Sequence, residues 1–327
     1  MIPRLAQVEP AQGRYLAFLE TLGQQGFQGE IRSDYGTRLV QSTDNSIYQI
    51  LPQAAVFPIN KSDLIILLKL ATHEKYRNIR FAPRGGGTGT NGQSLTDGII
   101  IDCSRHMNDI RELNLEQGWV KVGPGVVLDQ LNDFLRPYGV FFAPNLSPSS
   151  RATLGGMINT DACGKGSRVY GRTSDHLLEL SCLLSNGEEL HSVPLNPKEL
   201  TDWKEASGRT GEVYRVVDEI VCRQAELIKE VFPKMSRFMT GYNLDRVYSN
   251  DQRPIFNLNY LLAGSEGTLA VVHEAKLRLT PLPTFQELIV VKYESFDDAL
   301  RAAGILVQSD PTAVSYTHLT LPTNREV

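Results

Sequence analysis

The chain has 327 residues, a net charge of −4 and a sequence pI of about 5.9, the composition of an ordinary soluble protein with about two domains. Lysines and arginines are scattered rather than clustered, which argues against nucleic acid as the main partner. No apolar run approaches the ~20 residues needed to span a membrane, and the N-terminus lacks a signal-peptide core. We expect a cytoplasmic protein, with peripheral contact to the inner membrane left open.

The four cysteines and six histidines show no spacing typical of a metal site. Cys103, Cys163, Cys182 and Cys222 form no C-x-x-C pair, so we expect neither a zinc nor an iron–sulfur site in this chain. Cys163 lies in a glycine-rich segment, where a small residue tolerated in a tight turn is favoured over a redox-active thiol.

The N-terminal residues 1–50 are predicted to be an extension that contains one amphipathic helix, because four apolar residues between positions 15 and 22 recur at helical spacing. A β-α-β unit is predicted next: a strand at 55–58, a helix at 64–74 capped by Ser62 or Asp63, and a strand at 78–83. Such a unit favours a parallel pair of strands joined by a right-handed crossover.

Residues 81–94 read F-A-P-R-G-G-G-T-G-T-N-G-Q-S and contain five glycines. Three adjacent glycines let the backbone reach positive φ and approach a ligand, and successive bare N–H groups suit an anion such as pyrophosphate. The run satisfies G-x-G-x-x-G, but turn residues at 93–98 and the β-branched run at 99–101 follow in place of a helix, and a Walker A ending is missing. We therefore predict a phosphate-binding loop between strands and favour it over a ligand-free glycine hairpin.

The remaining elements follow from apolar periodicity. In chain order they are a strand at 119–122, a helix with Leu128, Leu131 and Leu135 on one face, a mostly half-buried strand at 178–184 closed by the turn Asn186-Gly187, a helix from 213 to 231, and a long alternating strand at 269–279. Residues 232–256 look like an irregular insertion. Pro281 and Pro283 mark a domain boundary, after which a strand at 288–293 and a helix at 296–307 are predicted.

Three segments resemble the flavin-binding loops of the vanillyl-alcohol-oxidase or PCMH-type class of FAD enzymes. They are Pro83–Gly89, then Thr153–Gly164 followed by Tyr170-Gly171, and finally Gly264–Leu269. One such motif would be weak evidence, whereas three in the family's order over roughly 190 residues are specific.

The resemblance implies an α+β fold, namely the two-subdomain PCMH-type FAD-binding fold, over residues 51–282. The start of an incomplete α/β cap domain would occupy residues 283–313. Residues 314–327 resemble a translated sequencing adapter more than a genuine tail, and we exclude them from fold reasoning.

The resemblance also implies which residues bind FAD. Backbone N–H groups of the first loop would meet the pyrophosphate, with hydroxyl groups of Thr88, Thr90 and Ser94 as further donors. The complete candidate set is Arg84, Gly85, Gly86, Gly87, Thr88, Gly89, Thr90, Ser94, Thr153, Gly155, Gly156, Asn159, Asp161, Gly164, Tyr170, Gly171, Glu266 and Gly267.

Three candidate side chains have two interpretations each. Arg84 would contact phosphate or brace the loop through backbone carbonyls. Asp161, like Asn159, would hydrogen-bond the ribityl chain or flavin ring, or else brace its own loop. Glu266 would lie on the adenosine side of the cofactor or cap a helix or turn.

The first loop has Thr88 where some relatives link the flavin covalently through histidine, so we expect non-covalent FAD. His106 and His176 lie near the flavin loops in sequence, but a structural role is favoured for each. In the hydroxy-acid branch of this class the base, carboxylate-binding residues and metal ligands come mainly from the cap domain. We therefore expect no metal site here and assign no catalytic residue.

The resemblance is strongest, over about residues 1–310, to D-2-hydroxyglutarate dehydrogenases that carry FAD and iron–sulfur clusters. Those proteins are longer, with a cap domain and a C-terminal [4Fe-4S] region, so we expect this chain to be a fragment. The resemblance implies oxidation of a D-2-hydroxy acid, D-2-hydroxyglutarate first, with electrons passed to a downstream acceptor. The alternatives are a D-lactate or glycolate dehydrogenase, an enolpyruvyl-sugar reductase, and a non-catalytic flavin-binding module.

Overall fold

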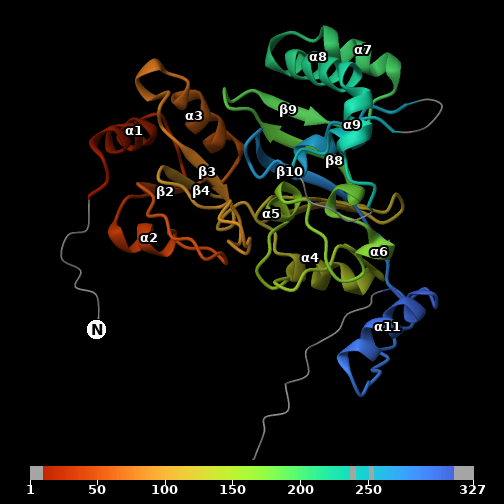
Figure 1. The fold of residues 1–327 in the computed structure, drawn as a ribbon. Coiled ribbons are helices and arrows are strands. Elements are labelled where there is room, and N and C mark those ends of the chain that lie inside the picture. The colour runs from red at the N-terminus through yellow and green to blue at the C-terminus, as the bar shows by residue number, and fades with distance from the viewer. Residues whose placement is uncertain (1–9, 236–240, 250–253, 313–327) are drawn as a thin grey trace, which may run out of the picture.

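The computed structural model describes residues 10–235, 241–249 and 254–312. Within them, helices pack around two separate β-sheets, and the last helix lies at the periphery (Figure 1). The fold is thus a mixture of helix and sheet, as the sequence predicts. No helix in this described part is both long and apolar enough to cross a membrane.

The first sheet has four strands. In spatial order they are β1 (Glu30–Arg32), β2 (Ala54–Phe57), β4 (Ile99–Asp102) and β3 (Phe81–Arg84). The predicted direct pairing of β2 with β3 is wrong, because the fully buried β4 lies between them and runs parallel to both. All four residues of β4 are buried, as are those of β2, and its three consecutive isoleucines suit a strand between two parallel neighbours.

The N-terminal residues pack into this first subdomain. The predicted amphipathic helix is confirmed as α1 (Gly13–Gln24), and it buries Tyr15, Phe18, Leu19 and Leu22. These side chains share one hydrophobic cluster with helix α3 (Lys61–Ala71), while β1 pairs antiparallel with β2 and precedes α2 (Tyr35–Val40). Residues that the sequence suggested to be an extension therefore form part of the core.

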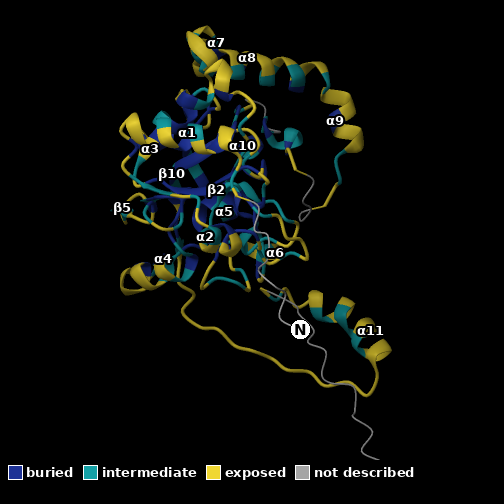
Figure 2. Ribbon diagram, turned by 90° about the vertical axis from the view of Figure 1, so that its left-hand side faces the viewer, coloured by how far each residue is buried: buried dark blue, intermediate teal, exposed yellow. Residues whose placement is uncertain are grey.

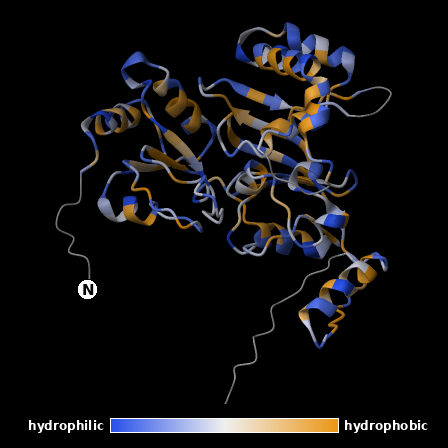
Figure 3. Cartoon of the chain, in the orientation of Figure 1, coloured by the Kyte–Doolittle hydropathy of each residue, from blue (hydrophilic) through white to orange (hydrophobic). Residues whose placement is uncertain are grey.

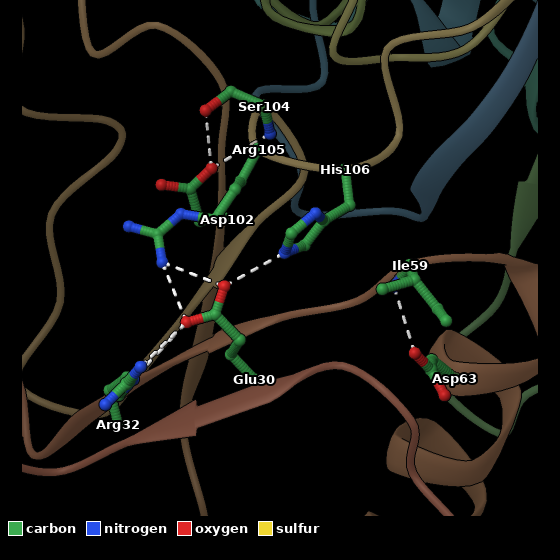
Figure 4. A network of polar contacts seen from close by, with 8 residues as sticks. All are labelled: Glu30, Arg32, Ile59, Asp63, Asp102, Ser104, Arg105 and His106. Carbon is green, nitrogen blue, oxygen red and sulfur yellow. Dashed lines mark hydrogen bonds and ion pairs between the residues drawn. The ribbon is translucent and has the colours of Figure 1, made fainter.

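Helix α3 begins earlier than predicted. Its N-cap is Asn60, whose side chain accepts a hydrogen bond from the backbone of Asp63. The Asp63 carboxylate instead accepts from the backbone N–H group of Gln28 at 2.8 Å. It also accepts from that of Ile59 at 3.0 Å (Figure 4). Asp63 thus joins the N-terminal segment to α3.

The second sheet is larger and antiparallel. In spatial order its strands are β5 (Ile110–Asn114), β6 (Trp119–Val122), β10 (Val271–Arg278), β8 (Leu177–Leu183) and β9 (Glu189–Ser192). The predicted strands at 119–122, 178–184 and 269–279 are confirmed within a few residues. The last four residues of β8 are all buried, so the predicted half-buried alternation fails there.

Further helices, 3-10 turns and one small ribbon complete the described fold. They are α4 (Leu128–Leu135), α5 (Leu154–Asn159), α6 (Ser167–Tyr170), α7 (Pro197–Glu205), α8 (Gly208–Arg223), α9 (Ala225–Val231), α10 (Asn259–Leu262), the 3-10 turns Glu74–Tyr76, Arg136–Tyr138, Thr173–His176 and Leu244–Arg246, and the ribbon of β7 (Val140–Phe141) with β11 (Thr280–Pro281). The predicted single helix at 213–231 is two helices, because Gln224 departs from helical geometry at φ −104° and ψ 15°.

The segment after β11 contains one correct and one wrong prediction. Helix α11 (Phe296–Val307) has the predicted bounds, whereas the predicted strand at 288–293 is absent from the described structure. Phe285 and Leu288 are 87% and 84% exposed, and apolar residues of α11 also face outward (Figures 2 and 3). An apolar stretch rich in β-branched residues does not become a strand without a neighbour to pair with. The predicted tail at 314–327 lies outside the described residues.

The two subdomains share a packed interface. Leu183 and Val271 of the second sheet belong to the hydrophobic cluster of the first, and Lys61 on α3 forms an ion pair with Glu189 on β9 at 3.0 Å. Buried His273 on β10 lies beside the same carboxylate, with its Nε2 2.9 Å from Glu189 Oε1. This interface therefore contains a titratable group.

Two buried histidines make stability depend on pH. Burial lowers the pKa of His273 and of His176 below the usual 6.5, although Glu189 and the Tyr170 carbonyl oppose this shift. As pH falls below about 6.5 the unfolded chain therefore binds more protons than the folded chain, and stability is lost.

We expect the free energy of unfolding, measured by urea denaturation, to decline as pH falls from about 7.5 to about 5.5. A His273→Gln variant should show a shallower decline, whereas a His73→Gln variant, which changes an exposed histidine, should match the wild type. Equal slopes in all three proteins would contradict the assignment to His273.

Candidate functional site

A single cavity of about 800 Å³ lies where segments distant in the sequence meet. Its wall is built from the glycine loop at 83–94, from residues 146–148 and the segment at 152–168, from Glu266 and Gly267, and from Val271, Val272, Val307 and Thr312. The volume falls within the roughly 300–1,000 Å³ typical of ligand pockets. The structure thus brings together residues from all three segments that the sequence singled out.

The glycine loop joins β3 to β4 without a helix, as predicted. Because these strands are parallel neighbours, the loop is a crossover and not a hairpin. Within the described part of the chain, the backbone N–H groups of residues 86–90 donate no hydrogen bond to another protein atom. These donors line the cavity and can meet ligand oxygens.

Two of the three adjacent glycines are required by loop packing. A Cβ atom on Gly85 would lie 2.1 Å from Thr153 Oγ1, and one on Gly86 would lie 2.0 Å from the carbonyl oxygen of Arg151. Only Gly87 among the three has positive φ, at +63°. The first loop therefore lies directly on the second, which only glycine at these two positions permits.

Arg84 braces the glycine loop. Its Nη2 donates to the carbonyl oxygen of Thr43 at 2.7 Å and its Nη1 donates to that of Gln41 at 3.4 Å. Burial lowers the pKa of this guanidinium, while the charges of Asp102 and Asp44 oppose that shift. These contacts favour the bracing interpretation over a phosphate contact, although Arg84 also lies on the cavity wall.

The second segment forms helix α5 instead of an open loop. Thr153 caps it, with its Oγ1 accepting from Gly156 N at 3.4 Å. Asn159 at its end joins two segments, because its Nδ2 donates to the Gly155 carbonyl oxygen at 2.8 Å and its Oδ1 accepts from Gly267 N at 3.0 Å. Gly155, Gly156 and Asn159 line the cavity, but the side chain of Asn159 is engaged in holding the wall together.

Asp161 lies outside the cavity wall. It is 2% exposed and has φ +45°. Its carboxylate accepts from Ser174 N at 2.9 Å and lies 3.3 Å from the guanidinium Nη1 of Arg172. The candidates Tyr170 and Gly171 also lie off the wall, whereas Gly164 lies on it. For Asp161 these contacts favour the interpretation that it braces its loop.

The charged side chains on the wall belong to different segments. Glu266 on the third segment lines the cavity with φ +52°, and Gly267 packs on Pro83 of the first loop. Lys165 and Arg168 line it from the segment that ends in α6. Sequence reasoning missed these two cations, because only their place in the fold, and no motif, brings them to the cavity.

Neither histidine considered from the sequence lies on the wall. His106 contacts Glu30 Oε1 through Nε2 at 3.0 Å, and His176 contacts the Tyr170 carbonyl oxygen at 2.7 Å. Half-buried Cys163 does lie on the wall. Among the described residues, no group of three or more His, Cys, Asp or Glu side chains is placed to hold a metal ion.

The parallel crossover packs on two further loops around one cavity. Residues 52–192 match the family model described as FAD binding domain. This region is thus similar to FAD-binding domains. The chain is 52% identical to the D-2-hydroxyglutarate dehydrogenase of Pseudomonas putida and 51% identical to that of Escherichia coli, over 96% of this chain and 31% of each relative. The chain therefore spans about a third of the length of these relatives.

A solved structure of alkyldihydroxyacetonephosphate synthase matches with a TM-score of 0.64 and 18% identity, covering 94% of this chain and 48% of that protein. At this level of identity the likeness concerns the fold alone. It supports the two-subdomain arrangement described above.

Proposed function

We propose that this chain is the FAD-binding part of an oxidoreductase that oxidises a D-2-hydroxy acid, with D-2-hydroxyglutarate as the first substrate to test. The observation that carries the proposal is the convergence of three loops on one cavity, in a chain about half identical to D-2-hydroxyglutarate dehydrogenases. A downstream electron acceptor would complete the turnover.

The residues on the wall fit FAD. The unpaired amides of residues 86–90, with the hydroxyl groups of Thr88 and Thr90, would hold the pyrophosphate. Gly155, Gly156, Gly164, Glu266 and Gly267 would line the rest of the cofactor. Bound FAD would supply the hydride acceptor that no amino-acid side chain provides.

Oxidation of the substrate requires two kinds of residue from the protein. A 2-hydroxy acid must lose its hydroxyl proton to a base, and its carboxylate needs a cation. Lys165 and Arg168 place positive charge on the cavity wall, whereas no histidine lies on the described wall. Because Arg168 already forms an ion pair with Asp310, we assign a role in carboxylate attraction to Lys165 and assign the base to no residue of this chain.

The substrate is tested with the longest product that the gene encodes, loaded with FAD and supplied with an artificial electron acceptor. We expect the highest kcat/KM with D-2-hydroxyglutarate among D-2-hydroxyglutarate, D-lactate and glycolate. A preference for D-lactate or glycolate would select another dehydrogenase of the class, and NADPH oxidation would select a reductase. FAD binding without any turnover would select a flavin-binding module.

The flavin should be released from the polypeptide by mild acid or heat, because Thr88 offers no nucleophilic ring nitrogen for a covalent link. Precipitating the loaded protein and measuring flavin fluorescence in the supernatant checks this. Flavin that stays with the precipitate after washing in denaturant would contradict non-covalent binding.

A further inference from the structure

Residues 41–48, which precede the matched FAD-binding region at 52–192, lie against the glycine loop. Asn45 N donates to the carbonyl oxygen of Gly87 at 3.0 Å, at the apex of the loop. Ser94 Oγ, at the far end, lies 3.0 Å from Asp44 Oδ2 and donates to it. Arg84, at the near end, donates to Thr43 O. This segment, here called the clamp segment, therefore contacts the beginning, apex and end of the loop.

The clamp segment is itself a closed turn. Thr43 and Gln49 form an antiparallel bridge, and Ile50 N donates to Ser42 O at 2.9 Å. Within the turn, Ser46 N donates to Asp44 Oδ1 at 2.8 Å. Asp44 thus uses one carboxylate oxygen inside the clamp segment and the other on the glycine loop, so its side chain joins the two.

The clamp segment is anchored to the first sheet. Gln41 Nε2 donates to the buried carboxylate of Asp102, at the end of β4, at 3.0 Å.

A second contact, upstream of the clamp segment, joins β1 to the turn after β4. The Glu30 carboxylate on β1 forms an ion pair with Arg105 Nη1 at 3.0 Å and also contacts His106, and both partners lie on that turn (Figure 4). Hydrogen bonds from Arg105, His106 and Arg32 lower the pKa of the Glu30 carboxyl to about 2, so it stays charged at neutral pH.

The loop needs such support. Glycine-rich backbone loses more conformational entropy on ordering than any other, and the amides of residues 86–90 have no protein acceptor to hold them in place. A loop fixed before the ligand arrives spares the ligand that ordering, which appears as higher affinity. The contacts from the clamp segment to the ends and apex of the loop do not use these amides, whose residues line the cavity.

We propose that the clamp segment is a positioning element for the cofactor, in which Asp44 sets the affinity for FAD by holding the glycine loop in shape without touching FAD. The inference rests on the proposed binding of FAD in this cavity. It assigns a function to residues that lie outside the matched family region. Asp44 is a positioning residue that acts through Ser94 and Arg84.

The test compares FAD affinity and dissociation rate, measured by flavin fluorescence on the 327-residue chain, between wild type and Asp44→Ala. We expect affinity to fall about ten- to hundredfold through faster dissociation, since the hydrogen bonds from Ser94 and Ser46 and one facing charge are lost. The melting temperature of the apoprotein should fall by no more than about 4 °C. Asp97→Ala is the matched control, because Asp97 ends the same crossover but pairs only with exposed Arg80 at 2.8 Å.

A double-mutant cycle with Ser94→Ala tests whether Asp44 affects FAD affinity through its hydrogen bond with Ser94. If Asp44 acts through Ser94, the double variant binds FAD about as weakly as Asp44→Ala alone. Additive losses would overturn the proposal, because they would mean that Ser94 contacts FAD independently. If Asp44→Ala does not fold, Asp44→Asn replaces it in the cycle under the same criteria, since it keeps an acceptor for Ser46 and loses the charge facing Arg84.

The two hypotheses fail differently. A wild-type chain that folds and binds no FAD would contradict the proposed function. A wild-type chain that binds FAD, with equal affinity in Asp44→Ala, would contradict the clamp segment alone.

Discussion

Replacing Gly86 with alanine is expected to weaken FAD binding on the order of 100-fold and to destabilise the chain by about 1–3 kcal/mol. The added Cβ would lie 2.0 Å from the carbonyl oxygen of Arg151. Since the obstacle is backbone and not the end of a flexible side chain, the first and second loops must separate. Fluorescence titration with FAD and urea denaturation of the apoprotein measure the two effects.

Gly13→Ala is the matched control for this substitution. Gly13 begins α1, far from the cavity wall, and a Cβ there meets no atom within 4 Å. Its FAD affinity should equal that of the wild type, and α1 should tolerate or gain from the change. Wild-type affinity in Gly86→Ala as well would show that the contact between the loops does not shape the site.

Replacing Asp161 with asparagine is expected to destabilise the chain by about 3–5 kcal/mol. The side chains of Asp161 and Arg172 are 3% and 5% exposed and lie 3.3 Å apart, so the substitution removes the charge that a buried guanidinium faces. Asparagine tolerates the positive φ of this position, which confines the effect to the lost charge. Urea denaturation of the apoprotein measures the loss.

Asp133→Asn provides the comparison, because Asp133 pairs with Arg136 at 3.1 Å on the surface, where both side chains are about 70% exposed. That change should cost about 0–1 kcal/mol. If Asp161 instead contacts the flavin, Asp161→Asn should lower FAD affinity while leaving the apoprotein nearly as stable as the wild type. The two measurements therefore separate the two interpretations of this residue.

Local sequence patterns predicted helices and strands well where the structure of a segment does not depend on which other segment packs against it. The spacing of apolar residues located α1, α4 and α11, and β-branched runs located β4 and β6. The predictions failed where a distant partner decides the outcome. The insertion of β4 between β2 and β3 is a long-range choice, and the stretch at 288–293 has the composition of a strand but no neighbouring strand among the described residues.

The site could be predicted in outline for a different reason. The three loops were found by resemblance, and the absence of a helix after the glycine run excluded a Rossmann site. The sequence could not show which neighbouring residues each side chain of the site contacts. Gly85 and Gly86 are required by the second loop, 65 or more residues away, and Asp161 faces Arg172, 11 residues further along its own segment, so contacts formed only in the folded chain determine both. Asp44 gave no local indication of its role.

The path of the glycine loop has a consequence for how this cofactor site can vary. Phe81 pairs with Ile99 and Arg84 with Asp102, so the chain leaving β3 must return only about 10 Å along the sheet and cross one strand spacing of about 5 Å. Residues 85–98 can span roughly 46 Å when extended. The extended length of the connection exceeds this separation, and the part of it not needed for closure is free to shape the cavity wall. The length of this loop can therefore change without changing the order of the strands. Insertions or deletions between β3 and β4 would enlarge, reduce or remove this part of the cavity wall and leave the sheet beneath it the same.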